Sequence, residues 1–138
     1  MIEKKEIKII IDTNLWISFL IGRELAELKN LLVDEKVKVV ISEQILEEIK
    51  LVTQRPKLQK YFPSHKVDEL IQLLRTIGIF INITSQVSLC RDAKDNYLLA
   101  LAKDSNADFL VTGDQDLLVI GKFECTQIVK YRDLLLRL

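Results

Sequence analysis

Five short apolar runs, separated by segments with helical periodicity, constrain the fold of this chain more than any other feature of its sequence. They cover residues 7–11, 37–41, 79–83, 107–112 and 126–129. Continuous apolar runs of this length are typical of strands that are buried on both faces. Strands that alternate with helices predict a parallel sheet covered on both sides and joined by right-handed crossovers. We therefore expect an α/β fold with a central parallel sheet of four to five strands.

The segments between these runs have the start and stop signals of helices. Ser42 is a favourable N-cap, and Ile45, Ile49 and Val52 then recur at helical spacing until Pro56 interrupts the pattern. We expect further helices over residues 15–21, 24–32, 66–76, 92–103 and 131–138, and one helical turn over 116–119.

Composition narrows the class of protein. The chain has 138 residues, 49% of them hydrophobic, which predicts a single domain over residues 1–138. Lys and Arg number 20, as do Asp and Glu, so the net charge indicates neither a nucleic-acid nor a membrane partner. The start lacks the pattern of a signal peptide, and no apolar stretch is long enough to cross a bilayer, so we expect a soluble cytoplasmic protein with no membrane partner. Cys90 and Cys125 lack zinc spacing and are expected to be buried, reduced thiols.

Two acids follow predicted strands directly. Asp12 ends the first apolar run, and Asp114 follows the run at 107–112 across Gly113. In open α/β sheets, functional residues gather beyond the carboxyl ends of the strands. The alternative for each acid is a structural one, because Asp is also a common helix N-cap and either residue could cap the helix that follows it.

Two further acids lie on predicted helices. Glu48 falls at the edge of the apolar stripe of its helix, and Asp95 falls on the face that should meet the sheet. Glu is common on helix surfaces, and Asp95 could instead complete a capping box with Asp92 as the cap. Four acids at one edge of a sheet would repel one another, and a divalent cation such as Mg²⁺ or Mn²⁺ would remove this conflict. Carboxylates without a Ser-His or Cys-His pair favour hydrolysis of phosphodiesters by metal-activated water.

The chain resembles proteins of the PIN-domain family, and most closely the small prokaryotic toxins of toxin–antitoxin pairs. The resemblance rests on residues 9–14 (IIIDTN), 42–49 (SEQILEEI), 55–57 (RPK), 92–96 (DAKDN), 99–102 (LALA) and 107–114 (ADFLVTGD). It implies a three-layer α/β/α fold and an endoribonuclease that depends on Mg²⁺ or Mn²⁺. It also implies RNA as the substrate and a separate antitoxin protein as the partner.

The resemblance also implies roles for individual residues. The catalytic and metal-binding acids would be Asp12, Glu48, Asp95 and Asp114. Asp116 would share or replace the role of Asp114, and Asp92 would support the site. Asn14 and Thr112 would orient a water molecule or a carboxylate. Ala93 stands where many relatives have proline, which should affect only the rigidity of that loop.

The densest basic stretch is a candidate for RNA binding. Arg55, Lys57 and Lys60, with Lys66 nearby, could bind RNA phosphates, while Tyr61 or Phe62 stacks on a base. The alternative is a solvated helix end. An antitoxin segment could bind near residues 15–32 and 43–52, and exposed apolar helix faces could form a homodimer.

Two other classes of function stay open. In the first, the fold is a non-catalytic module that binds RNA or protein. In the second, the chain is a phosphoacceptor domain such as a response-regulator receiver. A receiver needs paired acids at the end of its first strand, whereas this chain has only Asp12 there.

Overall fold

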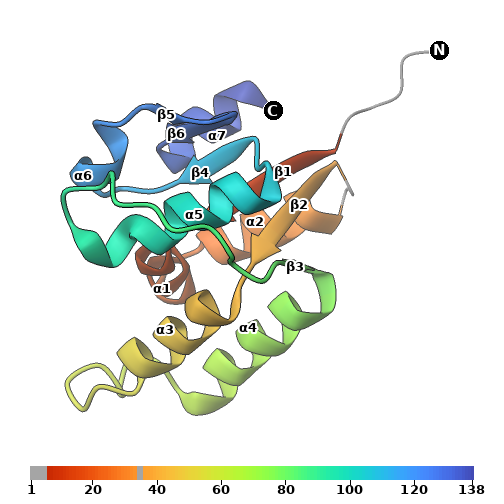
Figure 1. Ribbon diagram of the computed structural model, residues 1–138. Helices are drawn as coiled ribbons and strands as arrows, with labels where there is room; N and C mark the ends of the chain where they lie inside the picture. Colours follow the sequence, from red (N-terminus) through yellow and green to blue (C-terminus); the bar gives the residue numbers. More distant parts are fainter. Residues whose placement is uncertain (1–5, 34–35) are drawn as a thin grey trace.

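The computed structural model describes residues 6–33 and 36–138. Its strands form a six-stranded sheet in the order β3-β2-β1-β4-β6-β5 (Figure 1). The strands are β1 (Ile7–Ile11), β2 (Val37–Ile41), β3 (Ile79–Phe80), β4 (Phe109–Val111), β5 (Lys122–Phe123) and β6 (Thr126–Val129). The helices are α1 (Thr13–Ile21), α2 (Glu24–Val33), α3 (Glu43–Thr53), α4 (Ser64–Ile77), the 3₁₀ turn η1 (Ala93–Asp95), α5 (Asn96–Ser105), α6 (Gln115–Leu118) and α7 (Tyr131–Arg137).

The sheet is parallel except at one edge. β1 lies between β2 and β4, with Ile9 paired to Val39 on one side and to Phe109 on the other. Only β5 runs antiparallel, against β6. The predicted count of four to five strands was therefore one or two too low. β5 was not predicted because two residues are too few to show a strand pattern.

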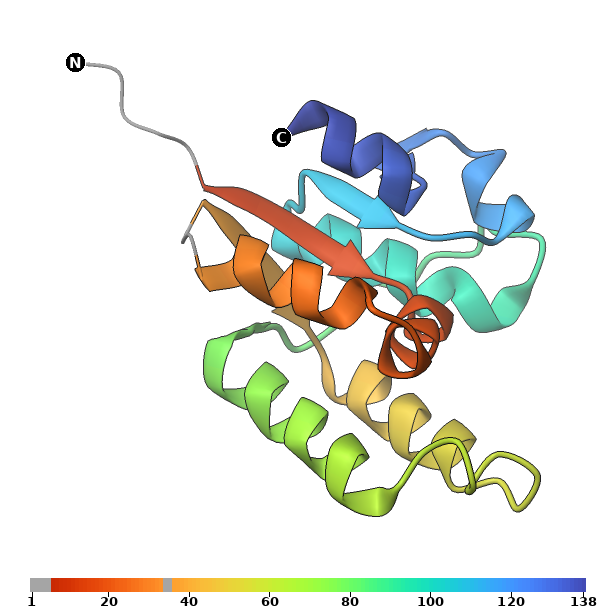
Figure 2. The ribbon, with the colours of Figure 1, turned by 180° about the vertical axis from the view of Figure 1, so that it is seen from behind.

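Helices cover both faces of the sheet and complete the three layers. Figures 1 and 2 show α5 on one face, and α2 and α7 on the opposite face. α3 packs against α1 and α4, and α4 also contacts β2. The α/β/α architecture expected from the alternating pattern is confirmed. No helix in residues 6–33 and 36–138 is long and apolar enough to cross a membrane.

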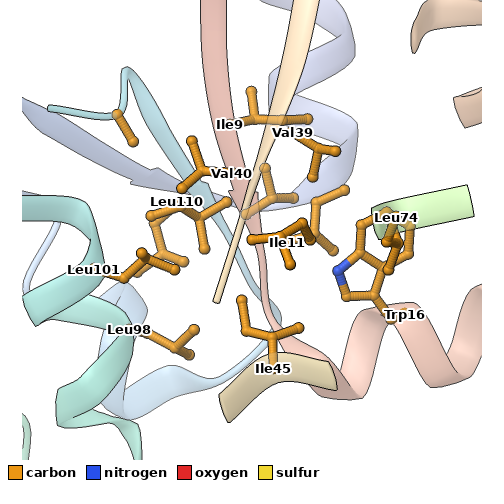
Figure 3. Close-up of a cluster of buried hydrophobic side chains, with 14 of the residues drawn as sticks. Ile9, Ile11, Trp16, Val39, Val40, Ile45, Leu74, Leu98, Leu101 and Leu110 are labelled. Carbon is orange, nitrogen blue, oxygen red and sulfur yellow. The ribbon is translucent and has the colours of Figure 1, made fainter. Parts of the chain in front are cut away.

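The core lies on both sides of the central strands. In Figure 3, Leu98 and Leu101 of α5 lie on one side of the sheet, and Trp16 and Leu74 lie on the other. Ile9, Ile10 and Ile11 of β1 are fully buried, as a central strand covered on both faces requires. Burial of one such side chain stabilises the fold by about 1.5–3 kcal/mol.

One predicted strand is shorter than expected. The apolar run at 79–83 forms a strand only over Ile79–Phe80, and its last bond to the sheet joins Ile81 N to Ile41 O at 2.9 Å. Beyond it, the backbone amides of Thr84 and Ser85 donate to the carboxylate of Asp104 at 2.7 and 3.0 Å. The chain leaves the sheet because a side chain on α5 supplies the acceptor that a neighbouring strand would otherwise provide.

One predicted helix differs in its first turn, and the predicted burial of one cysteine was wrong. The helix expected over 92–103 begins instead as η1 and continues as α5, because the Asp92 carboxylate accepts from Lys94 N at 3.1 Å and tightens the first turn. Of the two cysteines, Cys90 is buried, but Cys125 is exposed in the turn between β5 and β6. Both are free thiols, as expected.

Candidate active site

The carboxyl end of β1 places Asp12 inside the molecule. Its side chain is only 4% exposed, and Asp12 N donates to Val111 O of the neighbouring strand at 2.9 Å. The carboxylate caps α1 by accepting from Asn14 N at 3.2 Å. Burial raises the pKa of Asp12, although its hydrogen bonds oppose the rise. Asp12 therefore caps α1 as the structural alternative predicted, but burial of its carboxylate in the charged form costs free energy.

Thr112 links the acids of the two central strands. Its hydroxyl donates to Asp12 Oδ2 at 2.8 Å and accepts from Asp114 N at 3.0 Å. Thr112 N bonds to Val129 O at 3.0 Å, so the residue is also held by β6. Asp114 in turn caps α6, because its Oδ1 accepts from Asp116 N at 2.9 Å. Sheet geometry thus brings together two acids that lie far apart in the sequence.

Asp95 is the most electrostatically strained acid of the group. Its Oδ2 is buried and has no hydrogen-bond partner among the residues that the structure describes. The pKa of Asp95 rises to about 7, first through burial, then through a side-chain hydrogen bond with Asp114 and the charge of that residue, and last through the charges of Asp12 and Asp92. A carboxyl with these neighbours favours either a proton or a cation.

Glu48 reaches the same region from α3. Ser42 caps this helix, with Ile45 N donating to its Oγ at 3.5 Å. Ile45 and Ile49 are fully buried, whereas Glu48 is half-buried at the edge of the apolar stripe. Since α3 packs against α1, Glu48 lies near the start of α1 and its exposed Asn14.

These residues border a cavity of about 310 Å³, which we call the acid cavity. It is lined by Asn14, Glu48, Leu51, Val52, Arg55, Asp92, Lys94, Asp95 and Asp114. Asp12 and Thr112 do not line it. They interact with its acids from below the surface, Asp12 through its charge and Thr112 through Asp114 N. Asp116 also lies outside the lining, and its carboxylate is 4.0 Å from Arg91 Nη1.

The donor set fits a hydrated hard cation. In the described ranges, no group of three or more His, Cys, Asp or Glu side chains is arranged so that it could hold a metal ion. The cavity nevertheless offers carboxylate and amide oxygens, including the unpartnered Asp95 Oδ2. Mg²⁺ typically keeps several waters and uses only one or two carboxylates. The acid cavity therefore suits Mg²⁺ or Mn²⁺ better than a metal enclosed by protein ligands.

Two residues near the acids were missed by sequence reasoning. The Tyr97 hydroxyl lies 3.1 Å from Thr13 Oγ1, and burial, with Glu48 and Asp12 nearby, raises its pKa. Lys94 lines the acid cavity beside Asp95. Helical periodicity gave no signal for either contact, because each depends on how separate elements pack.

The predicted RNA-binding stretch divides into two parts. Arg55, Lys57 and Lys60 are all exposed, but of these only Arg55 lines the acid cavity. Lys60 Nζ lies 5.0 Å from the centre of the Tyr61 ring, and Tyr61 is 54% exposed. Phe62 is buried in the core, so the expectation that it could stack on a base was wrong.

Comparison with known proteins gives two matches. A profile of the PIN domain family matches residues 8–116 of this chain. An uncharacterized protein of Methanocaldococcus jannaschii is 34% identical over 119 residues, which make up 84% of this chain and 76% of that protein. No solved structure matches the chain. The range matched by the family profile contains all the acids of the cavity and Asp12 beneath it.

Proposed function

Because the chain belongs to the PIN-domain family, whose members are generally nucleases, we propose that it is a metal-dependent endoribonuclease. Its cofactor would be Mg²⁺ or Mn²⁺, and its acids would be Asp12, Glu48, Asp95 and Asp114. The observation that supports this proposal most strongly is the buried, unpartnered oxygen of Asp95 beside other carboxyls. A bound divalent cation would relieve the repulsion that the fold otherwise leaves uncompensated.

Each acid has a distinct part in this proposal. Asp95 and Asp114 line the cavity and would hold the cation, with Asp12 supporting them from beneath. Thr112 fixes the Asp12 carboxylate and the Asp114 backbone relative to each other. Glu48 comes from a different helix and would accept a hydrogen bond or a proton at the cavity. The exposed Asn14 amide would orient a water molecule or a phosphate oxygen.

The cation itself would supply Lewis acidity, which lowers the pKa of a coordinated water and stabilises charge on the phosphate oxygens. The remaining contributions come from this chain. Its carboxylates set the charge of the cavity, and its fixed Thr112 hydroxyl holds the Asp12 carboxylate and the backbone amide of Asp114. Hydrolysis would then leave a 5′-phosphate on one product.

Cleavage of single-stranded RNA by the purified chain tests the proposal. With Mn²⁺ or Mg²⁺ present, we expect cleavage that EDTA stops and that Asp95→Asn or Asp114→Asn abolishes. Asp133→Asn is the matched control, because Asp133 is exposed on α7 and lies outside the acid cavity. Cleavage that survives both cavity substitutions would exclude this site.

A non-catalytic RNA- or protein-binding module is the second candidate. The observation in its favour is that no three or more acids, His or Cys of the described residues are arranged so that they could hold a metal ion. Thermal unfolding with Mn²⁺ discriminates between the two functions, since a ligand of the folded state raises the melting temperature. A rise that Asp95→Asn cancels supports the enzyme, whereas no rise at all supports the binding module.

The toxin role and its partners are part of the same proposal. A second cavity of about 310 Å³ lies between α1, α2 and α4 and could receive an amphipathic segment of an antitoxin, because its lining combines Phe19, Leu25 and Leu70 with charged residues such as Lys29 and Glu69. Exposed apolar side chains such as Val33 and Leu136 are candidates for a homodimer contact. An RNA substrate is consistent with the expected cytoplasmic location.

A further inference from the structure

Two basic side chains border a cavity that is otherwise acidic. Arg55 follows the end of α3, and Lys94 belongs to η1, so they come from separate elements. We infer that Lys94 and Arg55 together bind the phosphates of a single-stranded RNA that enters the acid cavity. This inference rests on the proposed ribonuclease function and assigns Lys94 a role in it.

The charge of the cavity requires such residues. Four carboxylates line it, from Glu48, Asp92, Asp95 and Asp114, against two basic side chains. With all of them ionised, one divalent cation would bring the lining only to neutrality. An RNA strand carries a negative charge at every phosphate, so its attraction depends on basic groups that face the cavity. Lys94 and Arg55 are the only basic residues in its lining.

The local geometry leaves Lys94 available for a ligand. Its backbone amide donates to the Asp92 carboxylate at 3.1 Å, which fixes the turn without using the side chain. Successive side chains of a 3₁₀ turn point in different directions. Asp95 therefore buries a carboxylate oxygen, whereas its neighbour Lys94 is exposed.

Three other basic residues of the chain already have partners. Arg75 pairs with Glu43 at 3.0 Å, Arg91 lies 4.0 Å from Asp116, and Lys60 lies over the Tyr61 ring. Within the described part of the chain, the side chains of Arg55 and Lys94 form no ion pair and no hydrogen bond. Binding a phosphate would thus break no existing contact.

The lining also suits a nucleotide better than a simple anion. Leu51 is 66% exposed and lies one helical turn before Arg55 on the same wall of the cavity. An exposed apolar side chain beside a basic side chain offers a contact surface for ribose or a nucleobase. An inorganic ion would not use such a surface.

The salt dependence of RNA binding tests this inference. Fluorescence anisotropy would measure the affinity for a labelled single-stranded RNA in an Asp95→Asn background, where the proposed function predicts no cleavage. Each lost phosphate contact should reduce the slope of log affinity against log salt by about 0.7. We expect Lys94→Gln and Arg55→Gln each to reduce the slope by this amount, and to weaken binding about fivefold at low salt. Lys94→Arg should restore the slope.

Lys103→Gln is the matched control, because it removes the same charge from the far end of α5, outside the cavity lining. A purely structural role of Lys94 would lower the melting temperature and leave the slope unchanged, and this result would overturn the inference. An equal loss of slope in Lys103→Gln would also overturn it, because binding would then depend only on overall charge. RNA binding that is independent of Lys94 contradicts this inference alone, whereas failure of the parent chain to bind RNA contradicts the ribonuclease proposal as well.

Discussion

The protonation state of Asp95 determines how the acid cavity behaves. Its pKa of about 7, against an ordinary value of 3.8, results first from burial and then from three neighbouring carboxyls. An acid whose pKa is higher in the folded chain stabilises the fold when it is protonated. This contribution is fully present below the ordinary pKa of 3.8 and is lost as the pH rises through about 7.

Asp95→Asn should therefore change the pH dependence of stability in the metal-free chain. At pH 8 we expect the variant to be more stable than the parent by about 1 kcal/mol, a value kept low because the half-exposed site is partly screened by solvent. At pH 5 the difference should be clearly smaller, since Asp95 of the folded chain is then still protonated and only part of the contribution has been lost. Urea unfolding at both pH values measures the difference.

Asp133→Asn controls for the general loss of one negative charge, and it should show no such dependence on pH. If Asp95→Asn were less stable than the parent at pH 8, the carboxylate would have a favourable partner and its repulsion by Asp12 and Asp114 would not dominate.

Thr112 provides a second prediction at the scale of single residues. Thr112→Val keeps the shape but removes the hydroxyl that donates to the buried Asp12 and accepts from Asp114 N. Leaving buried polar groups unsatisfied should lower the free energy of unfolding by about 1–3 kcal/mol, as urea unfolding would show. Thr112→Ser retains the hydroxyl and should lose clearly less. Equal losses in both variants would mean that the methyl group matters and the hydrogen bonds do not.

At the scale of elements, the local sequence pattern predicted the strands whose bounds depend on local sequence alone. β1 and β2 were predicted with their true bounds because both are apolar runs, each interrupted only by one lysine, that are buried in the centre of the sheet. The predicted strand at 79–83 was too long because a contact from Asp104, on a distant helix, replaces the sheet bonds at Thr84 and Ser85. A tertiary contact of this kind cannot be predicted from the hydrophobic periodicity of the sequence.

The residues of the candidate site also differ in whether local sequence pattern could predict them. Asp12 and Asp114 could be selected because each follows a recognisable strand, and Asp95 because it lies on the sheet-facing side of a helix. Lys94 could not be selected, since its relation to Arg55 depends on the packing of η1 near the end of α3. Family resemblance supplied the role of Glu48, which helical position alone left ambiguous.

The segment after β3 provides a prediction at this scale. Asp104→Ala removes the acceptor for the amides of Thr84 and Ser85, so hydrogen exchange at these amides should become much faster, as mass spectrometry would detect. These hydrogen bonds lower the pKa of Asp104 to about 2. Their contribution to stability is present above the ordinary pKa of 3.8 and is lost as the pH falls through about 2.

Asp133→Ala is the control for this exchange experiment. Unchanged protection of Thr84 and Ser85 in Asp104→Ala would show that the segment is held by its apolar contacts instead, through partly buried residues such as Ile83 and Val87.

At the scale of the whole molecule, the parallel sheet brings the acids together. β1 and β4 are adjacent in the sheet although a long stretch of chain separates them. Asp12 and Asp114 therefore lie near each other beyond the carboxyl ends of these two strands. Figure 2 shows β1 pointing toward the start of α1, where Asp12 lies. Apolar burial fixes this arrangement, and the acids are held in place despite their mutual repulsion. The fold thus keeps acids close together at an electrostatic cost that a cation would offset.

The most direct test of this account is a crystal structure of the chain soaked in Mn²⁺ at pH 8, with the ion located by its anomalous scattering. We predict an ion in the acid cavity, bound to Asp95 and to Asp114 or Asp12, with the rest of its coordination completed by water. An acid cavity that holds no ion at saturating Mn²⁺, or an ion bound only elsewhere on the molecule, would contradict the account.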